Sequence, residues 1–212
     1  PVALINDGAK IIRERIVNKW QEKMKQLPEG QVKPMDGEIA VPALKKLEYN
    51  TSEELEELFL NLLTSASNQA KEGIVHPSFA NIISELSSDE ARILTYLKTE
   101  NQPICTVNIR VNYNNGTYSD HYHDTTIFDT NDVIKFKNNI RAYLENMKRL
   151  GLIKLWGIPT DVDQYNYIED YLEPSKQQLE QEKSDYRTIV YKRSFYDFTE
   201  FGKNFINSCL PD

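Results

Sequence analysis

The stretch SDHYHD at residues 119–124 holds two of the three histidines in the chain, together with two carboxylates. Imidazole is a common zinc ligand, so the stretch raises the question of a metal site. Alternation along an extended strand would place His121 and His123 on one face and the acids on the other. A tetrahedral zinc needs three or four ligands, and the remaining histidine and both cysteines lie in unrelated parts of the sequence. We therefore expect no metal, and His121 and His123 are the only candidate ligands.

Other catalytic arrangements are missing from the sequence. It contains no G-x-S-x-G elbow, no phosphate-binding loop, no dinucleotide glycine fingerprint and no H-E-x-x-H pair. Paired acids such as Glu53 and Glu54 fall on a predicted solvated helix face, where little would shift their pKa values toward acid–base work. The sequence thus predicts no catalytic residues, no cofactor and no enzymatic activity, and a histidine–metal hydrolase is the most distant alternative.

Basic residues gather in one segment of an acidic protein. The chain has a net charge of -7, but residues 132–154 hold six Lys and Arg against two acids, a local charge of +4. A helix that reads a DNA groove needs such donors for phosphates and base edges, although the same residues are also ordinary solvated surface. The candidate nucleic-acid-binding residues are Lys135, Lys137, Arg141, Lys148, Arg149, Lys192 and Arg193. DNA binding is an alternative that the net charge opposes.

The elements that must position these residues fall into two groups. Apolar residues at helical spacing predict a helix over residues 8–27, and Pro and Gly predict a loop over 28–42. A capping box formed by Thr51 and Glu54 should open the next helix. Shorter helices should follow Pro77 and begin at Ser87. Residues 1–86 are therefore predicted to be a helical N-terminal part.

The second group mixes strands and helices. We predict a β-hairpin over 104–124 with its turn at Asn115-Gly116, followed by a helix that begins at Val133 and ends at Gly151. Strands are predicted over 152–156 and 187–195, and a last helix from Thr199. The polar, acidic residues 161–185, with Pro174 as a break, are interpreted as an inserted arm outside the core. This order predicts an α+β, mainly helical fold whose C-terminal part, residues 87–212, is winged-helix-like with a long arm inserted in the wing.

Length and composition set further bounds. A chain of 212 residues can bury a core without disulfides or metals. Its two cysteines show no C-x-x-C spacing, no secretory segment precedes them, and no apolar run approaches 18 residues. We expect a cytoplasmic protein with no stable membrane span in this chain. Because the sequence opens at Pro1 rather than Met, we also expect preceding residues, which would decide any membrane association.

Several stretches together resemble a known family. These are ALKKLEYNTSEELEELFLNLLTSA at 43–66, VHPSFANIISELSSDEARILTYL at 75–97, YLENMKRLGLIKL at 143–155 and FTEFGKNFINSCLP at 198–211. They resemble the Abi-alpha family, bacterial proteins of unknown function whose name links them to abortive infection, a phage-defence response. The family supplies no established catalytic residues to transfer. The SDHYHD stretch lies outside every matching block, so the resemblance gives its histidines no support as a shared site.

The sequence and the resemblance lead to one functional hypothesis and two alternatives. We expect a non-enzymatic bacterial interaction or regulatory protein that acts on an unidentified protein partner, in phage defence. A winged-helix transcriptional regulator that binds DNA is the first alternative, and the metal hydrolase is the second. An oligomer is compatible with the sequence.

Overall fold

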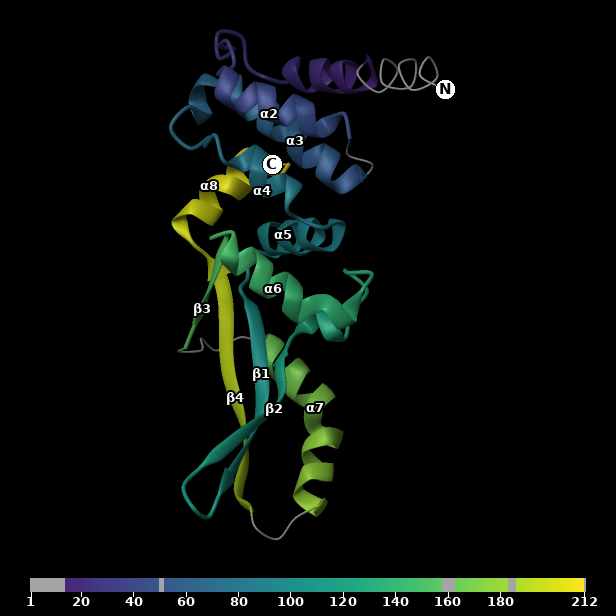
Figure 1. The fold of residues 1–212 in the computed structure, drawn as a ribbon, viewed down its shortest axis with the longest axis vertical. Coiled ribbons are helices and arrows are strands. Elements are labelled where there is room, and N and C mark those ends of the chain that lie inside the picture. The colour runs from purple at the N-terminus through teal and green to yellow at the C-terminus, as the bar shows by residue number, and fades with distance from the viewer. Residues whose placement is uncertain (1–13, 50–51, 158–162, 183–185, 212) are drawn as a thin grey trace. The chain divides into compact units, whose positions relative to one another are not determined.

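The computed structural model describes residues 14–49, 52–157, 163–182 and 186–211. It is an α+β protein with one four-stranded antiparallel sheet in the order β2-β1-β4-β3, and Figure 1 labels its elements. The chain divides into two compact units: residues 1–95 with 200–212, and residues 96–199. The predicted boundary at residues 86 and 87 placed the C-terminal helix with the sheet, whereas this helix belongs to the first unit.

Unit 1 is helical. Residues 14–24 form the first described helix and end before Pro28, as the sequence predicts. The others are α2 (Gly37–Leu47), α3 (Glu53–Ala66), the short η1 (Gln69–Lys71), α4 (Phe79–Ser84), the first part of α5 (Ser88–Glu100) and α8 (Glu200–Cys209). Their apolar faces are buried against one another, because each amphipathic helix must cover its stripe.

Helix α3 lies at the centre of this unit. Its apolar face, including Phe59 and Leu62, is fully buried, and it packs against α2, α4 and α8. One acid on α3, Glu56, is only 5% exposed, and it accepts hydrogen bonds from Arg15 and from Lys19, whose Nζ lies 2.7 Å away. A buried carboxylate needs such partners, so this pairing fixes the first helix against α3.

Two sequence predictions for unit 1 are wrong in detail. The loop predicted over 28–42 ends earlier, because α2 begins at Gly37 and contains Pro42. Proline inside a helix removes one hydrogen bond, and the burial of Ile39, Ala43 and Leu47 on the same helix offsets that loss. The cap of α3 is Ser52, whose side chain accepts from the Leu55 N–H. The predicted cap Thr51 lies outside the described residues.

The predicted start of α5 is confirmed. Ser87 Oγ accepts from the Glu90 N–H at 3.3 Å, and Glu90 accepts from the Ser87 N–H at 2.6 Å. This reciprocal pair is a capping box, in which a hydroxyl and a carboxylate three residues later satisfy the first amides of a helix.

Unit 2 contains the sheet. Its elements are the end of α5, β1 (Ile104–Tyr113), β2 (Tyr118–Thr125), η2 (Ile127–Asp129), η3 (Lys137–Asn139), α6 (Ile140–Arg149), β3 (Ile153–Trp156), α7 (Asp163–Glu182) and β4 (Tyr186–Phe198). The predicted hairpin is confirmed: Gly116 adopts φ +83° in a turn closed by the Gly116 N–H to Tyr113 carbonyl bond. Gly151 ends α6 with φ +74°, also as predicted.

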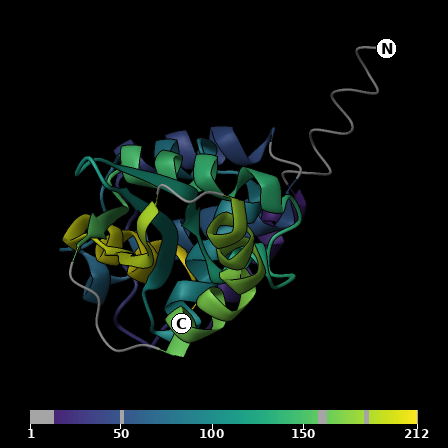
Figure 2. The same cartoon turned by 90° about the horizontal axis from the view of Figure 1, so that it is seen from below.

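The arm predicted over 161–185 is instead part of the core. Most of it is α7, a 20-residue helix that continues through Pro174 and runs beside β1 and β4 (Figures 1 and 2). Tyr165, Ile168 and Leu172 are fully buried on its inner face. They form a cluster with Cys105, Val107 and Ile109 of β1. The acidic composition of the segment misled the interpretation, because only one stripe of a surface helix needs to be apolar.

Two further differences concern the winged-helix prediction. The helix predicted from Val133 begins only at Ile140, and the preceding residues are irregular or 3-10 helical, with Phe136 56% exposed. The final helix, α8, packs on α3 in unit 1. Its Phe205 also meets Phe79 of α4 edge to face, with the ring centroids 5.2 Å apart. The order α6, β3, β4 is present, with β3 and β4 antiparallel, and the winged-helix assignment stays a prediction.

Candidate functional site

The SDHYHD stretch forms a bulge in edge strand β2. The pairing register with β1 shifts here: Ile109 lies opposite His121, but Val107 lies opposite Thr125. Residues 122–124 therefore bulge opposite Asn108 alone. Tyr122 and Asp124 have positive φ values of 51° and 49°. Aspartate tolerates this left-handed conformation, whereas for a bulky residue such as tyrosine it is strained.

Side chains from three elements satisfy the backbone of the bulge. Asn108 Oδ1 on β1 accepts from the Asp124 N–H at 2.7 Å, and Thr125 Oγ1 donates to the Tyr122 carbonyl at 2.9 Å. Arg141, in the first turn of α6, donates through Nε to the His123 carbonyl. Bulges recur beside functional sites because they change the direction of a side chain, and these bonds fix this one in place.

Burial dominates the electrostatics of the bulge. It raises the pKa of the Asp124 carboxyl above its ordinary value, although the positive charges of Arg141, His123 and Lys148 act in the opposite direction. The neighbouring Asp120 behaves differently: Arg110 donates to both of its oxygens at 2.6 and 2.7 Å and lowers its pKa. The two carboxylates of this stretch therefore differ in their affinity for a proton.

The two candidate metal ligands do not share a simple strand face. The left-handed Tyr122 interrupts the alternation on which that prediction depended. His121 is half-buried, with its Nε2 3.0 Å from Ser119 Oγ, whereas His123 is exposed. Within residues 14–49, 52–157, 163–182 and 186–211, no group of three or more His, Cys, Asp or Glu is placed to hold a metal ion.

A cavity of about 310 Å³ opens beside the bulge. It lies between β2, η2, α6 and α7, all within unit 2, and is lined by Tyr122, Thr125, Asp129, Arg141, Tyr171, Leu172 and Ser175. Two of these polar groups already have structural roles: Thr125 Oγ1 bonds the bulge, and Asp129 accepts from the Thr126 N–H in a capping box that opens η2. The two phenols, the Arg141 guanidinium and the Ser175 hydroxyl are the groups most able to meet a ligand.

The candidate nucleic-acid-binding residues do not form one surface. Lys192 and Arg193 are consecutive on β4 and point to opposite faces of the sheet. Arg193 turns toward α7, where it donates to both Glu169 oxygens at 2.6 and 2.9 Å. Lys137 pairs with Asp132 at 2.9 Å, and Arg149 bonds Asn146 of its own helix. Lys135, Arg141, Lys148 and Lys192 are exposed.

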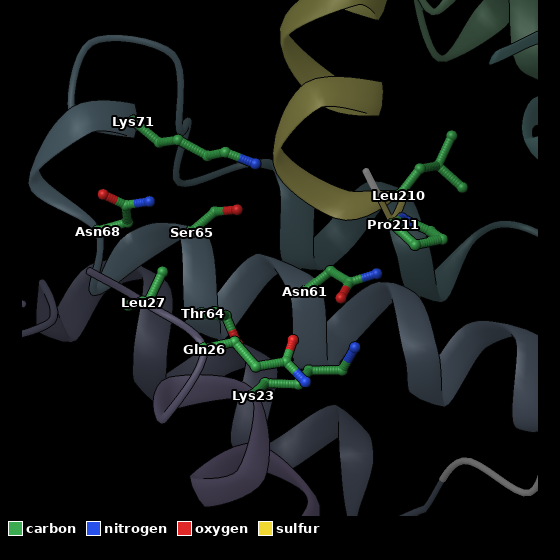
Figure 3. A pocket seen from close by; sticks show the side chains of 10 residues that line it. All are labelled: Lys23, Gln26, Leu27, Asn61, Thr64, Ser65, Asn68, Lys71, Leu210 and Pro211. Carbon is green, nitrogen blue, oxygen red and sulfur yellow. The ribbon is translucent and has the colours of Figure 1, made fainter. Parts of the chain in front are cut away.

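Unit 1 contains a second cavity, of about 340 Å³, shown in Figure 3. Two lysines line it: Lys71 extends toward α8 and donates to the Asn207 carbonyl at 2.8 Å, and Lys23 pairs with Glu57 at 2.5 Å. The residues that line it come from the C-terminal parts of the first helix and α3, from the end of α8 and from η1 with its N-cap Asn68. Helix C-termini carry partial negative charge, so the lysines have a structural role there, and the same charge disfavours an anionic ligand.

His76 also has a structural role in unit 1. Its Nδ1 accepts from the Ser78 N–H at 3.1 Å, and its ring packs against Phe79 and Phe201.

Sequence reasoning missed most of the residues around the bulge. Tyr122 lies inside the stretch that drew attention, but the two histidines beside it carried the more familiar chemical signal. Tyr171 and Ser175 lie in the segment interpreted as an arm. No sequence signal connects them to β2, because the cavity exists only once α7 has packed on the sheet.

The family model for abortive infection alpha matches residues 10–209. The chain belongs to the abortive infection alpha family. The resemblance found in the sequence is thereby confirmed over nearly the whole chain.

Other comparisons add little about function. No curated protein matches the chain. An uncharacterized protein of the marine bacterium Alcanivorax borkumensis SK2 is similar in structure, with a TM-score of 0.39 and 16% identity over 66% of this chain and 94% of that one. No helix in the described ranges is long and apolar enough to cross a membrane.

Proposed function

We propose that this abortive infection alpha protein acts without catalysis, by binding a partner protein in phage defence. The observation that carries the proposal is the edge of β4. This strand spans Tyr186–Phe198 and pairs with β1 over nearly its whole length. On its other side β3 pairs only with Phe195 to Phe198. Among the described residues, nothing pairs with that side of residues 186–194.

An incomplete strand edge fits a peptide. Its outward N–H and C=O groups can each bond the backbone of an added strand, the mode called β-augmentation. The phosphate backbone of a nucleic acid offers only hydrogen-bond acceptors, so it cannot match both the donors and the acceptors along the edge. The edge therefore favours an extended protein segment in line with β3.

The charge of the β4 edge indicates which side chains the partner's extended segment should carry. Residues 186–194 contain no Asp or Glu, and Arg193 among their basic residues is already paired with Glu169 of α7. Lys192 is exposed and makes no ion pair within the described part of the chain. A second copy of this chain would bring the same positive charge against itself. The preferred partner presents an extended segment that carries acidic residues.

A charge reversal on this edge tests the proposal. Wild type, Lys192→Glu and Lys148→Glu would be used to capture partners from the native host during phage challenge. The control variant makes the same charge change at an exposed residue of α6. We expect wild type and Lys148→Glu to capture the same protein and Lys192→Glu to lose it.

Hydrogen exchange with the captured protein locates the contact. Binding should slow exchange at amides within residues 186–194, because outward N–H groups of the edge gain partners. Equal capture by Lys192→Glu, or protection confined to other segments, would overturn the proposal.

A winged-helix DNA-binding regulator is a second candidate. The observation in its favour is that exposed Lys148 and Arg149 lie in the last turn of α6, directly before β3, which pairs antiparallel with β4. A loss of DNA binding in Lys148→Glu, with protein capture unchanged, would favour this candidate.

A further inference from the structure

Tyr122 combines strain with exposure. Its φ of 51° lies in the left-handed region, where glycine, asparagine or aspartate would fit with less strain. Its side chain is 46% exposed, and no hydrogen bond of its hydroxyl is found among the described residues. The Tyr122 side chain therefore contributes little stability to the fold that would offset the strain of its backbone. Strained residues persist where a function requires their side chain in one direction.

The left-handed turn brings the Tyr122 side chain to the cavity beside the bulge. Tyr171 of α7 lines the same cavity, is 53% exposed, and likewise has no hydrogen bond from its hydroxyl within the described ranges. Two phenol rings from separate elements thus border one space of about 310 Å³. Aromatic side chains at a cavity wall offer flat faces on which a planar ring can stack.

Arg141 adds a positive charge to this wall. Only its Nε is used, in the bond to the His123 carbonyl, and its Nη groups make no hydrogen bond among the residues described. A guanidinium presents paired N–H donors that match a phosphate group. The lining acid Asp129 is held in the cap of η2, so it does not neutralise Arg141 through an ion pair.

We propose that the cavity binds a nucleoside monophosphate. Its planar base stacks between or against Tyr122 and Tyr171, and its phosphate accepts hydrogen bonds from the Arg141 Nη groups. The cavity volume is at the lower end of small-molecule sites and fits a ligand of this size. This site is independent of the β4 edge, and the two can fail separately.

The first experiment separates the ring from the phosphate. Binding of AMP and CMP to the full chain would be measured by calorimetry, with adenosine and inorganic phosphate as partial ligands. We expect each nucleotide to bind at least about tenfold more tightly than either partial ligand, since both contacts must form together. No binding of AMP or CMP at about 5 mM, which would occupy most sites of even a millimolar ligand, overturns the proposal. Phosphate bound as tightly as AMP would also overturn it.

Variants then place the ligand in this cavity. Tyr171→Ala and Tyr122→Asn should each weaken AMP binding by about tenfold or more, in line with losing one stacking contact. Tyr118→Asn is the control, because Tyr118 is an exposed tyrosine of the same strand outside the cavity. Arg141→Lys keeps the charge but loses the paired donors, and should weaken AMP more than adenosine. Unchanged AMP binding in both cavity tyrosine variants would show that any nucleotide binds elsewhere.

Discussion

Tyr122 offers a direct test of the strain in the bulge. Asparagine adopts the left-handed conformation more readily than tyrosine, so Tyr122→Asn should raise the free energy of unfolding by about 0.5–1 kcal/mol. Urea midpoints of wild type and variant measure this. The matched change Tyr118→Asn, in a regular part of β2, should leave stability unchanged or lower it, because tyrosine favours strands. A lower midpoint for Tyr122→Asn than for Tyr118→Asn would contradict the strained conformation.

The two cysteines should be chemically inert in the folded protein. Burial raises the pKa of the Cys105 thiol to about 11 and that of Cys209 well above its ordinary value. Because the thiolate is the reactive form, a rise of about two pKa units lowers its fraction near neutral pH by about a hundredfold. Ellman's reagent at pH 8 should therefore label neither thiol in native protein and both in urea. Rapid labelling of the native protein would show that one of them is exposed.

Acid sensitivity should come partly from the start of α3. The pKa of Glu54 is lowered to about 2, first by a backbone hydrogen bond, then by Ser52 and by Arg92 on α5. Because the pKa is lower in the folded state, the ionised carboxylate stabilises the protein at a pH above the unfolded-state pKa of about 4.5. This stabilisation is lost as the pH falls toward 2. The side chain is 30% exposed, so screening reduces the contribution to about 1 kcal/mol.

The comparison of wild type with Glu54→Gln over pH measures this contribution. We expect wild type to be more stable at pH 7 and the two stabilities to converge between pH 4.5 and about 2. A constant difference across that range would mean that Glu54 acts by packing and not by its charge.

At the scale of elements, α7 is the best test of the core of unit 2. Ile168 is fully buried against the sheet, whereas Tyr167 beside it is 55% exposed. Truncating a buried isoleucine removes apolar contacts and leaves a cavity, so Ile168→Ala should lower the free energy of unfolding by about 2–5 kcal/mol. Tyr167→Ala should cost under about 1 kcal/mol. Equal urea midpoints for the two variants would restore the interpretation of α7 as an arm outside the core.

Elements with strong local signals could be predicted from the sequence. The hairpin turn at Gly116, the end of α6 at Gly151 and the cap at Ser87 each depend on one or two residues whose backbone preference leaves little choice. Strands β1 and β4 followed from period-two alternation of their apolar residues. Local chemistry was thus sufficient for these boundaries.

The rest depended on tertiary contacts. Pro42 and Pro174 lie inside helices because burial elsewhere on each helix outweighs one lost hydrogen bond. The bulge at residues 122–124 needs Asn108 and Arg141, which are distant in sequence. The cavity also needs α7 in place. No pattern within SDHYHD could therefore reveal that Tyr122, and not the histidines, faces a ligand-sized space.

At the scale of the whole molecule, net charge limits DNA binding. With a net charge of -7 and exposed cations spread over several faces, few phosphates can be contacted at once. We expect a dissociation constant weaker than about 1 µM at about 150 mM salt, with a shallow dependence on salt. Electrophoretic mobility shifts over a range of salt concentrations measure this. A submicromolar, sequence-specific complex that Arg141→Glu with Lys148→Glu abolishes would make the regulator the leading hypothesis.

Unit 1 is built from two parts of the chain that are distant in sequence, residues 1–95 and 200–212, and this has a consequence for synthesis on the ribosome. Helix α8 packs on α3, and Asn61 of α3 donates to the Cys209 carbonyl at 3.1 Å. A nascent chain emerges from its N-terminus, so residues 96–199 are available to fold while unit 1 still lacks α8. Until residues 200–209 have been made and α8 has packed, the apolar face of α3 that α8 covers is open to chaperones and proteases. Translation that stalls before residue 200 should release a chain whose sheet unit is folded and whose helical unit is degraded.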